Sequence, residues 1–178
     1  MLAEVKAGRP AAQCSSDLHA CPCGYAGDPT KNCTCSSSAV ARYQQRISGP
    51  LLDRIDIFAD VPRVEYEKLT EEIVAEGSEE VQARVEGSRE RQRERFVGTK
   101  LVCNAEMGPV EVREQCQRLL EEGAITLLRM AMNQLSMSAR AFHRVLKVAR
   151  TVADLSGQEV ISTRHLAEAL QYRQRVVG

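Results

Sequence analysis

The chain is organised around the stretch ISGPLLDRID, residues 47–56. Gly49-Pro50 ends a helix that runs into this stretch, because proline cannot continue a helix. Apolar and polar residues alternate loosely over residues 55–61, which predicts a strand. Arg54 is thereby held between a turn and a strand, and a held guanidinium is suited to meeting a phosphate. The alternative is that Arg54 forms a solvent-exposed ion pair with a neighbouring aspartate.

Composition narrows the class of protein. The 178 residues carry 24 basic and 24 acidic side chains, so net charge does not indicate a nucleic-acid binder. There is no tryptophan, and the core must be largely aliphatic. Neither a run of about twenty apolar residues nor an apolar leader occurs, so we expect a cytoplasmic protein without a membrane partner. In that compartment the seven cysteines are thiols or metal ligands rather than disulfides.

Four of these cysteines form two closely spaced pairs, Cys21-Pro22-Cys23 and Cys33-Thr34-Cys35, separated by nine residues. Glycine, proline and asparagine make the intervening loop rich in turns, so it can fold back and bring the pairs together. Four thiolates satisfy tetrahedral zinc. Two interpretations remain open: a structural zinc site, or a loop of small, partly buried free thiols.

The second half of the chain predicts helices. Ser78 is expected to cap a charged helix that runs to about Phe96. Positive and negative side chains are mixed along this helix, which indicates a solvated surface with many ion pairs. The alternative is that the helix faces DNA. A narrow apolar seam lies along it: Val81, Val85, Gln92 and Phe96. Pro109 is well placed to start the next helix, which Gly123 should end.

Two further helices begin at serine caps. Ser138 caps the strongest one, to about Leu155, and Ser162 caps the last. The apolar stripe expected on the strongest helix comprises Ala141, Val145, Val148, Ala149, Val152 and Leu155. Arg140, Arg144 and Lys147 share another face of it, which is either a solvated basic surface or an anion contact at the helix start.

Three segments carry a resemblance to a known family. Ser48–Asp56, Cys21–Tyr25 and Ser138–Arg144 resemble motifs that occur in the same order in magnesium-chelatase-like AAA+ ATPases of the ComM/YifB type. The resemblance implies that Arg54 is an arginine finger reaching the γ-phosphate of a nucleotide in the neighbouring subunit. It also implies that Arg140 is the sensor-2 arginine. His19 stands at the sensor-1 position, where the family has asparagine.

The resemblance further implies a mainly α fold, with an all-helical AAA+ lid preceded by a truncated α/β core remnant and a cysteine-rich loop. We expect residues 1–18 to be irregular or foreign to the fold, 19–64 to be the end of the ATPase core, 65–108 a linker with the charged helix, and 109–173 the lid. No G-x-x-x-x-G-K-[ST] phosphate loop and no strand ending in Asp-Glu occurs in the chain. We therefore predict that the chain alone does not hydrolyse ATP.

The implied function is that of the C-terminal part of a ring ATPase. It would work with ATP and Mg²⁺ in a homo-oligomeric ring, by resemblance a hexamer, that drives branch migration or translocation on DNA in natural transformation. The alternatives are a magnesium-chelatase motor subunit, or a non-enzymatic, zinc-stabilised helical interaction module.

Overall fold

A computed structural model describes residues 21–28, 30–46, 55–59, 61 and 76–173. Within these ranges the structure is helical and contains no β-strand, which confirms a mainly α fold. The chain divides into two compact units, Met1–Ile55 and Asp56–Gly178. The described helices include none with the length and apolar character needed to span a membrane.

The first unit contains the cysteine pairs and helix α1, Ser37–Gln44. A serine caps this helix: Ser36 Oγ accepts a hydrogen bond from the Ala39 N–H at 3.3 Å. None of its side chains is buried.

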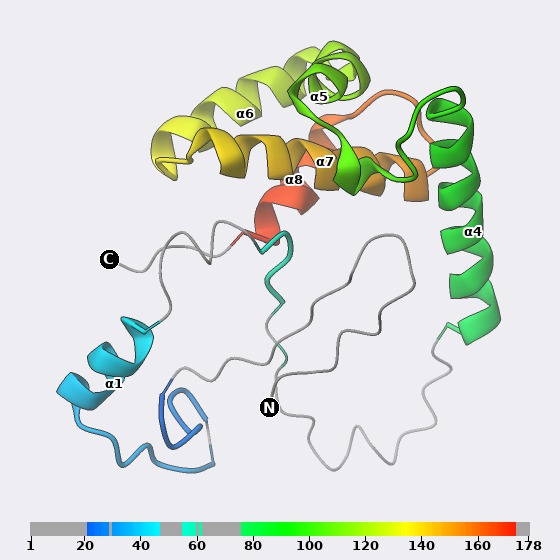
Figure 1. The fold of residues 1–178 in the computed structure, drawn as a ribbon. Coiled ribbons are helices and arrows are strands. Elements are labelled where there is room, and N and C mark those ends of the chain that lie inside the picture. The colour runs from blue at the N-terminus through cyan, green and yellow to red at the C-terminus, as the bar shows by residue number, and fades with distance from the viewer. Residues whose placement is uncertain (1–20, 29, 47–54, 60, 62–75, 174–178) are drawn as a thin grey trace. The chain divides into compact units, whose positions relative to one another are not determined.

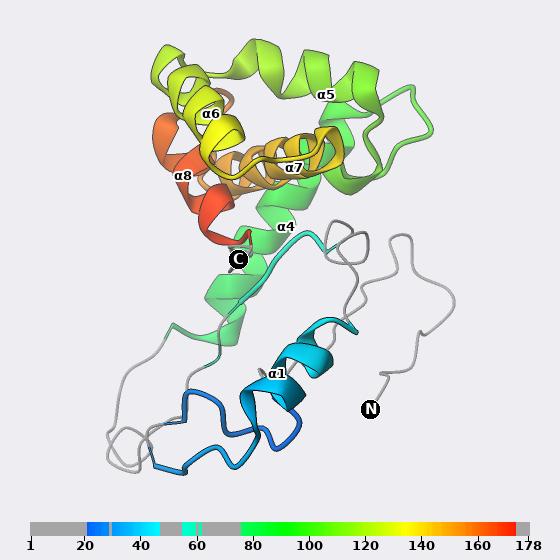
Figure 2. The same cartoon turned by 90° about the vertical axis from the view of Figure 1, so that its left-hand side faces the viewer.

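The second unit is a bundle of helices around α7 (Figures 1 and 2). Helix α7 packs against α4, α5 and α8, and α6 packs against α8. The bounds are α4 Ser78–Arg95, α5 Pro109–Gln115, α6 Glu122–Gln134, α7 Ala139–Leu155 and α8 Thr163–Gln171, with short 3₁₀ turns at Asn104–Glu106 and Gln117–Leu119.

Most helix starts follow from local chemistry. Ser138 and Ser162 cap α7 and α8 through their hydroxyls, and Pro109 opens α5, all as predicted. For α4 the cap lies one residue earlier than expected, because Gly77 has the extended conformation of an N-cap and Ser78 is already helical.

Helix α7 buries a broader face than its sequence predicted. Ala141, Val145, Ala149 and Val152 are buried as expected, whereas Leu155 keeps 37% of its surface exposed. Leu146 and Ala153 are fully buried in addition. A single apolar stripe suits a helix that is covered from one side, and α7 is covered from several, so it forms the centre of the core.

Gly123 does not end a helix, contrary to the sequence prediction; it lies in the first turn of α6. The segments preceding α6 and α8 run side by side, with the Glu121 N–H bonded to Ile161 O at 3.0 Å. The two helix starts are consequently very close. A Cβ on Gly123 would lie 2.6 Å from Thr163 Oγ1, so the close approach, and not a turn, requires glycine there.

The strand predicted over residues 55–61 is also wrong for the part that the structure describes. A strand needs a neighbouring strand to bond its backbone. Here the Phe58 N–H donates instead to Tyr172 O, at the C-terminal cap of α8, at 2.8 Å. This segment therefore packs on a helix end.

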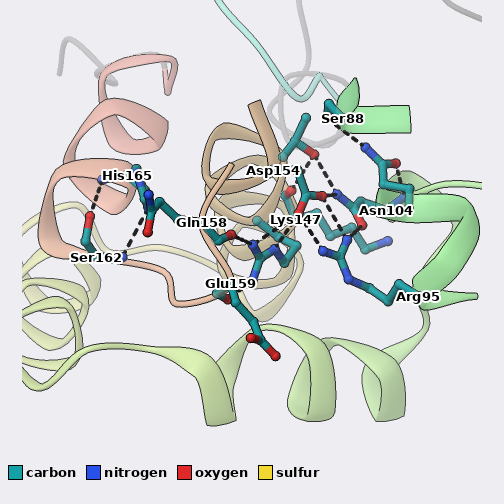
Figure 3. Close-up of polar contacts among 12 residues, drawn as sticks. Ser88, Arg95, Asn104, Lys147, Asp154, Gln158, Glu159, Ser162 and His165 are labelled. Atoms are coloured by element: carbon teal, nitrogen blue, oxygen red, sulfur yellow. Dashed lines mark hydrogen bonds and ion pairs between the residues drawn. The ribbon is translucent and has the colours of Figure 1, made fainter. Parts of the chain in front are cut away.

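A buried polar cluster fixes α4 against α7 (Figure 3). Asp154 on α7 receives hydrogen bonds from Arg95 at the end of α4 and from Arg150 one turn earlier on α7. Asn104 completes the cluster by donating to Asp154 Oδ2 at 2.8 Å and accepting from Arg95 at 2.8 Å. Arg150 and the Asp154 side chain are fully buried, and their hydrogen-bonding groups are satisfied.

Candidate functional site

The first turns of α7 border a surface pocket of about 370 Å³ in the second unit. Ser138 sets the direction of this helix start, because its hydroxyl accepts from the Ala141 N–H at 3.1 Å. The pocket is lined by Asp56, Ala105, Ala139, Arg140, His143, Arg144 and Lys147. Five of these seven residues belong to α7, so the helix start is the main wall of the site.

Three cationic side chains converge on the pocket, and each has a different setting. Arg140, in the first turn of α7, is exposed. Arg144 is half-buried and forms an ion pair with Asp56. Lys147 donates to Ala105 O at 2.9 Å; burial, with the nearby Arg144 charge, lowers its pKa.

This arrangement is suited to an anion. The three cations outnumber the single carboxylate in the lining, Asp56. The start of α7 adds the positive end of the helix dipole. Guanidinium groups bind phosphate oxygens in bidentate fashion, so Arg140 and Arg144 are matched to a phosphate chain.

The structure describes the surroundings of some of the predicted site residues but not of others. Arg140, Arg144 and Lys147 do share one face of α7, as their spacing indicated. Arg54 and His19 lie outside the described residues, so their predicted roles stay predictions. Asp56 and His143 also line the pocket. Sequence reasoning missed Asp56, because its partner Arg144 lies far along the chain and no local pattern marks the pair.

The four paired cysteines come together in the first unit. Their sulfur atoms all lie within 4.8 Å of one another. Cys21 is buried, and Cys23, Cys33 and Cys35 are partly buried. A hydrogen bond from the Tyr25 backbone, together with one from the Cys21 side chain, lowers the pKa of the Cys23 thiol to about 6. These four thiols are the donor set of a metal site. The sequence alone did not decide between a metal site and a loop of free thiols.

His165, in contrast, has a structural role. It is buried at the start of α8, and its Nδ1 accepts the Ser162 N–H at 3.2 Å. Cys116 is fully buried, and desolvation raises the pKa of its thiol to about 12. Neither residue lines either of the two pockets described for this unit, so both are core groups.

Comparison with known proteins identifies the family. Residues 10–69 match the family model for magnesium chelatase, subunit ChlI, and residues 75–173 match the model for its C-terminal part. The chain is 40% identical over 142 residues to the competence protein ComM of Haemophilus influenzae and 39% identical over 140 residues to the uncharacterized protein YifB of Escherichia coli. These alignments cover 79% and 78% of this chain.

The chain spans only about a quarter of these relatives, 27% of ComM and 26% of YifB. A YifB protein of Salmonella typhimurium is 35% identical over a similar share, 78% of this chain and 26% of the relative. The two family models together cover all of the described residues. The chain therefore belongs to the magnesium-chelatase-like family of AAA+ type that includes ComM and YifB.

Proposed function

We propose that this chain provides the lid and the end of the ATPase core of a ring-forming AAA+ motor. In this proposal Arg140 contacts the phosphates of the nucleotide bound in its own subunit, as a sensor-2 arginine. Arg54 acts as the arginine finger on the nucleotide of the neighbouring subunit. The observation that carries the proposal is the position of Arg140 at the edge of a cationic pocket at the start of α7.

The pocket supports a phosphate contact better than a merely solvated basic face. Charges on a solvated face point into bulk water, whereas Arg140, Arg144 and Lys147 surround one hollow. Arg144 and Lys147 are held by Asp56 and by the Ala105 carbonyl, so their heads are already positioned. Such preorganised charge is worth more to a developing negative charge than mobile surface groups are.

The surrounding machine is proposed from the family. Nucleotide hydrolysis with ATP and Mg²⁺ requires a phosphate loop and a magnesium-binding carboxylate, and the 178 residues contain neither motif. The ring, by family resemblance a hexamer, would lie in the cytoplasm and act on DNA, through branch migration during natural transformation. The chain is similar to a protein named for competence, and this favours a role on DNA over the alternative role as a magnesium-chelatase motor subunit.

The test uses a chimera in which residues 21–173 replace the matching part of Haemophilus influenzae ComM. Arg140→Ala should lower the kcat for ATP by about 10²-fold or more, as expected for loss of one transition-state contact. Arg129→Ala is the matched control, because Arg129 is exposed on α6 and does not line the pocket. Wild-type turnover in the Arg140→Ala ring, with its oligomeric size unchanged, would refute the proposal.

A further inference from the structure

We propose that Cys21, Cys23, Cys33 and Cys35 bind one structural zinc ion that holds together the first unit of the chain. The sulfur atoms already have the spacing that such an ion needs. Zinc–sulfur bonds of about 2.3 Å at tetrahedral angles place the ligand sulfurs about 3.8 Å apart. Here Cys21 Sγ lies 3.3 Å from Cys23 Sγ and 3.7 Å from Cys33 Sγ, and Cys23 Sγ lies 3.6 Å from Cys33 Sγ.

The backbone after the first cysteine pair is folded to present these sulfurs. Gly24 has a φ of +83°, and its N–H donates to Cys21 O at 3.1 Å, which closes a tight turn. The Ala26 N–H donates to Cys21 Sγ at 3.2 Å. Backbone N–H groups directed at a sulfur stabilise its thiolate form, which is the form that binds a metal.

The rest of the loop is held by polar contacts. The Asp28 carboxylate accepts from the Thr30 N–H at 2.7 Å, from the Thr30 hydroxyl at 2.8 Å and from the Lys31 N–H at 3.1 Å. The Lys31 ammonium lies 4.8 Å from the centre of the Tyr25 ring. These contacts bring the second cysteine pair back toward the first.

The small apolar burial among the described residues of this unit is the physical reason for a metal. Of the described residues in 21–46, Cys21 alone is buried. A small folded segment that buries so little apolar surface does not offset its loss of chain entropy. A tetrahedral ion supplies the missing free energy, as structural zinc does in other small folds.

The ion would also anchor α1. Cys35 directly precedes Ser36, which caps this helix, so a bond from the metal to Cys35 fixes the helix start. An isolated helix of eight residues is marginal in water, and α1 buries none of its side chains. Loss of the metal should therefore release α1 while leaving the helices of the second unit intact.

The donor set selects the metal. Four thiolates in tetrahedral array favour zinc or iron over magnesium, calcium and manganese, which prefer oxygen ligands. All four sulfurs lie within 4.8 Å of one another, which leaves room for a single ion. A single ion held by four thiolates with no open position is a structural site, so we assign no catalytic step to it.

Metal analysis of the 178-residue chain, purified without chelators, tests the proposal. We expect about one zinc per chain in the wild type and loss of it in Cys33→Ser and Cys35→Ser. Cys103→Ser is the matched control, because Cys103 is a partly buried thiol outside the cluster. A stoichiometric iron content, a metal-free chain after reconstitution under reducing conditions, or a cysteine disulfide in the freshly purified protein would each overturn the zinc assignment.

Two further measurements cover the case in which a serine variant misfolds. Cobalt added to the metal-free wild-type chain should show the d–d and charge-transfer bands of tetrahedral thiolate ligation, and zinc should displace them. Amide hydrogen exchange should be faster in Ser37–Gln44 after metal removal, with exchange in α7 unchanged. Absent cobalt bands, or unchanged exchange in α1, would count against the site.

Discussion

Arg95 Nη1 lies 2.8 Å from Asp154 Oδ2, and this contact joins the last residue of α4 to the last turn of α7. Arg150 approaches the same carboxylate from within α7, its Nε 3.1 Å from Oδ1. Arg150 also donates to the Gln158 and Glu159 carbonyls in the loop that follows the helix. One buried carboxylate thus positions two guanidinium groups, a helix and a loop.

Removing the charge of Asp154 should therefore destabilise the chain strongly. Asp154→Asn keeps the shape of the side chain but leaves Arg150, which is fully buried, without a counter-charge. We expect a loss of about 3–5 kcal/mol in the free energy of unfolding, measured by urea denaturation. Glu76→Gln is the control: it breaks an exposed pair with Arg84 and should change stability by less than about 1 kcal/mol. Equal effects of the two substitutions would contradict the proposed role of the cluster.

This cluster marks the limit of what could be predicted from the sequence. Ser138, Ser162 and Pro109 could be assigned correctly because a cap or helix start depends on a few adjacent residues. Arg150 and Asp154 look like ordinary polar residues on α7. Their burial depends on α4 and on the loop after α7, and no periodicity within one helix reveals these neighbours.

The same distinction applies to the candidate site. The cationic face of α7 follows from the spacing of Arg140, Arg144 and Lys147, and the cysteine cluster follows from two closely spaced pairs and a turn-rich loop. The ion pair of Arg144 with Asp56 joins residues 88 positions apart and has no local signal. Gly123 was misassigned for the same reason, because the atom that requires glycine belongs to Thr163 on another helix.

His165 should make stability depend on pH. Its Nδ1 accepts the Ser162 N–H, which only the neutral imidazole can do, and burial lowers its pKa below the ordinary value of about 6.5. As the pH falls, the unfolded chain binds the proton first. This contribution to stability is therefore present above about pH 6.5 and is lost as the pH falls toward the folded-state pKa.

His165→Gln retains an acceptor for Ser162 without a titrating group. The variant should show a flatter dependence of the free energy of unfolding on pH between about 7.5 and 5.5 than the wild type, in urea titrations at several pH values. Parallel pH profiles for the two proteins would show that His165 does not carry this dependence.

Because the starts of α6 and α8 lie so close together, the effect of Gly123→Ala on stability should change sign when Thr163 is also substituted. Gly123→Ala alone should destabilise the chain by about 1 kcal/mol, because the new Cβ would meet Thr163 Oγ1. Thr163→Ala removes that oxygen. In the Thr163→Ala background Gly123→Ala should become neutral or stabilising, since alanine is favoured over glycine in a helix by up to about 1 kcal/mol. Thermal melts of the four proteins measure the coupling, and strict additivity would argue against the contact.

The proposed roles of Arg54 and Arg140 differ in which subunit each one serves, and mixed rings separate them. An arginine finger acts across a subunit interface, whereas a sensor-2 arginine acts on its own nucleotide. In the ComM chimera, subunits with an inactivated phosphate loop should restore ATP turnover when mixed with Arg54→Ala subunits. Each Arg54→Ala subunit keeps a working phosphate loop and can receive a finger from a neighbour.

The same phosphate-loop variant should not restore turnover to Arg140→Ala subunits, because no subunit in that mixture combines a working phosphate loop with its own Arg140. Each single variant alone should lose about 10²-fold or more in kcat, and more for the finger, whose contribution is typically about 10³-fold or larger. ATP turnover is measured at a range of mixing ratios, with Arg129→Ala subunits as the control. Rescue of Arg140→Ala, or failure to rescue Arg54→Ala in rings that exchange subunits, would reverse the assignment of the two arginines.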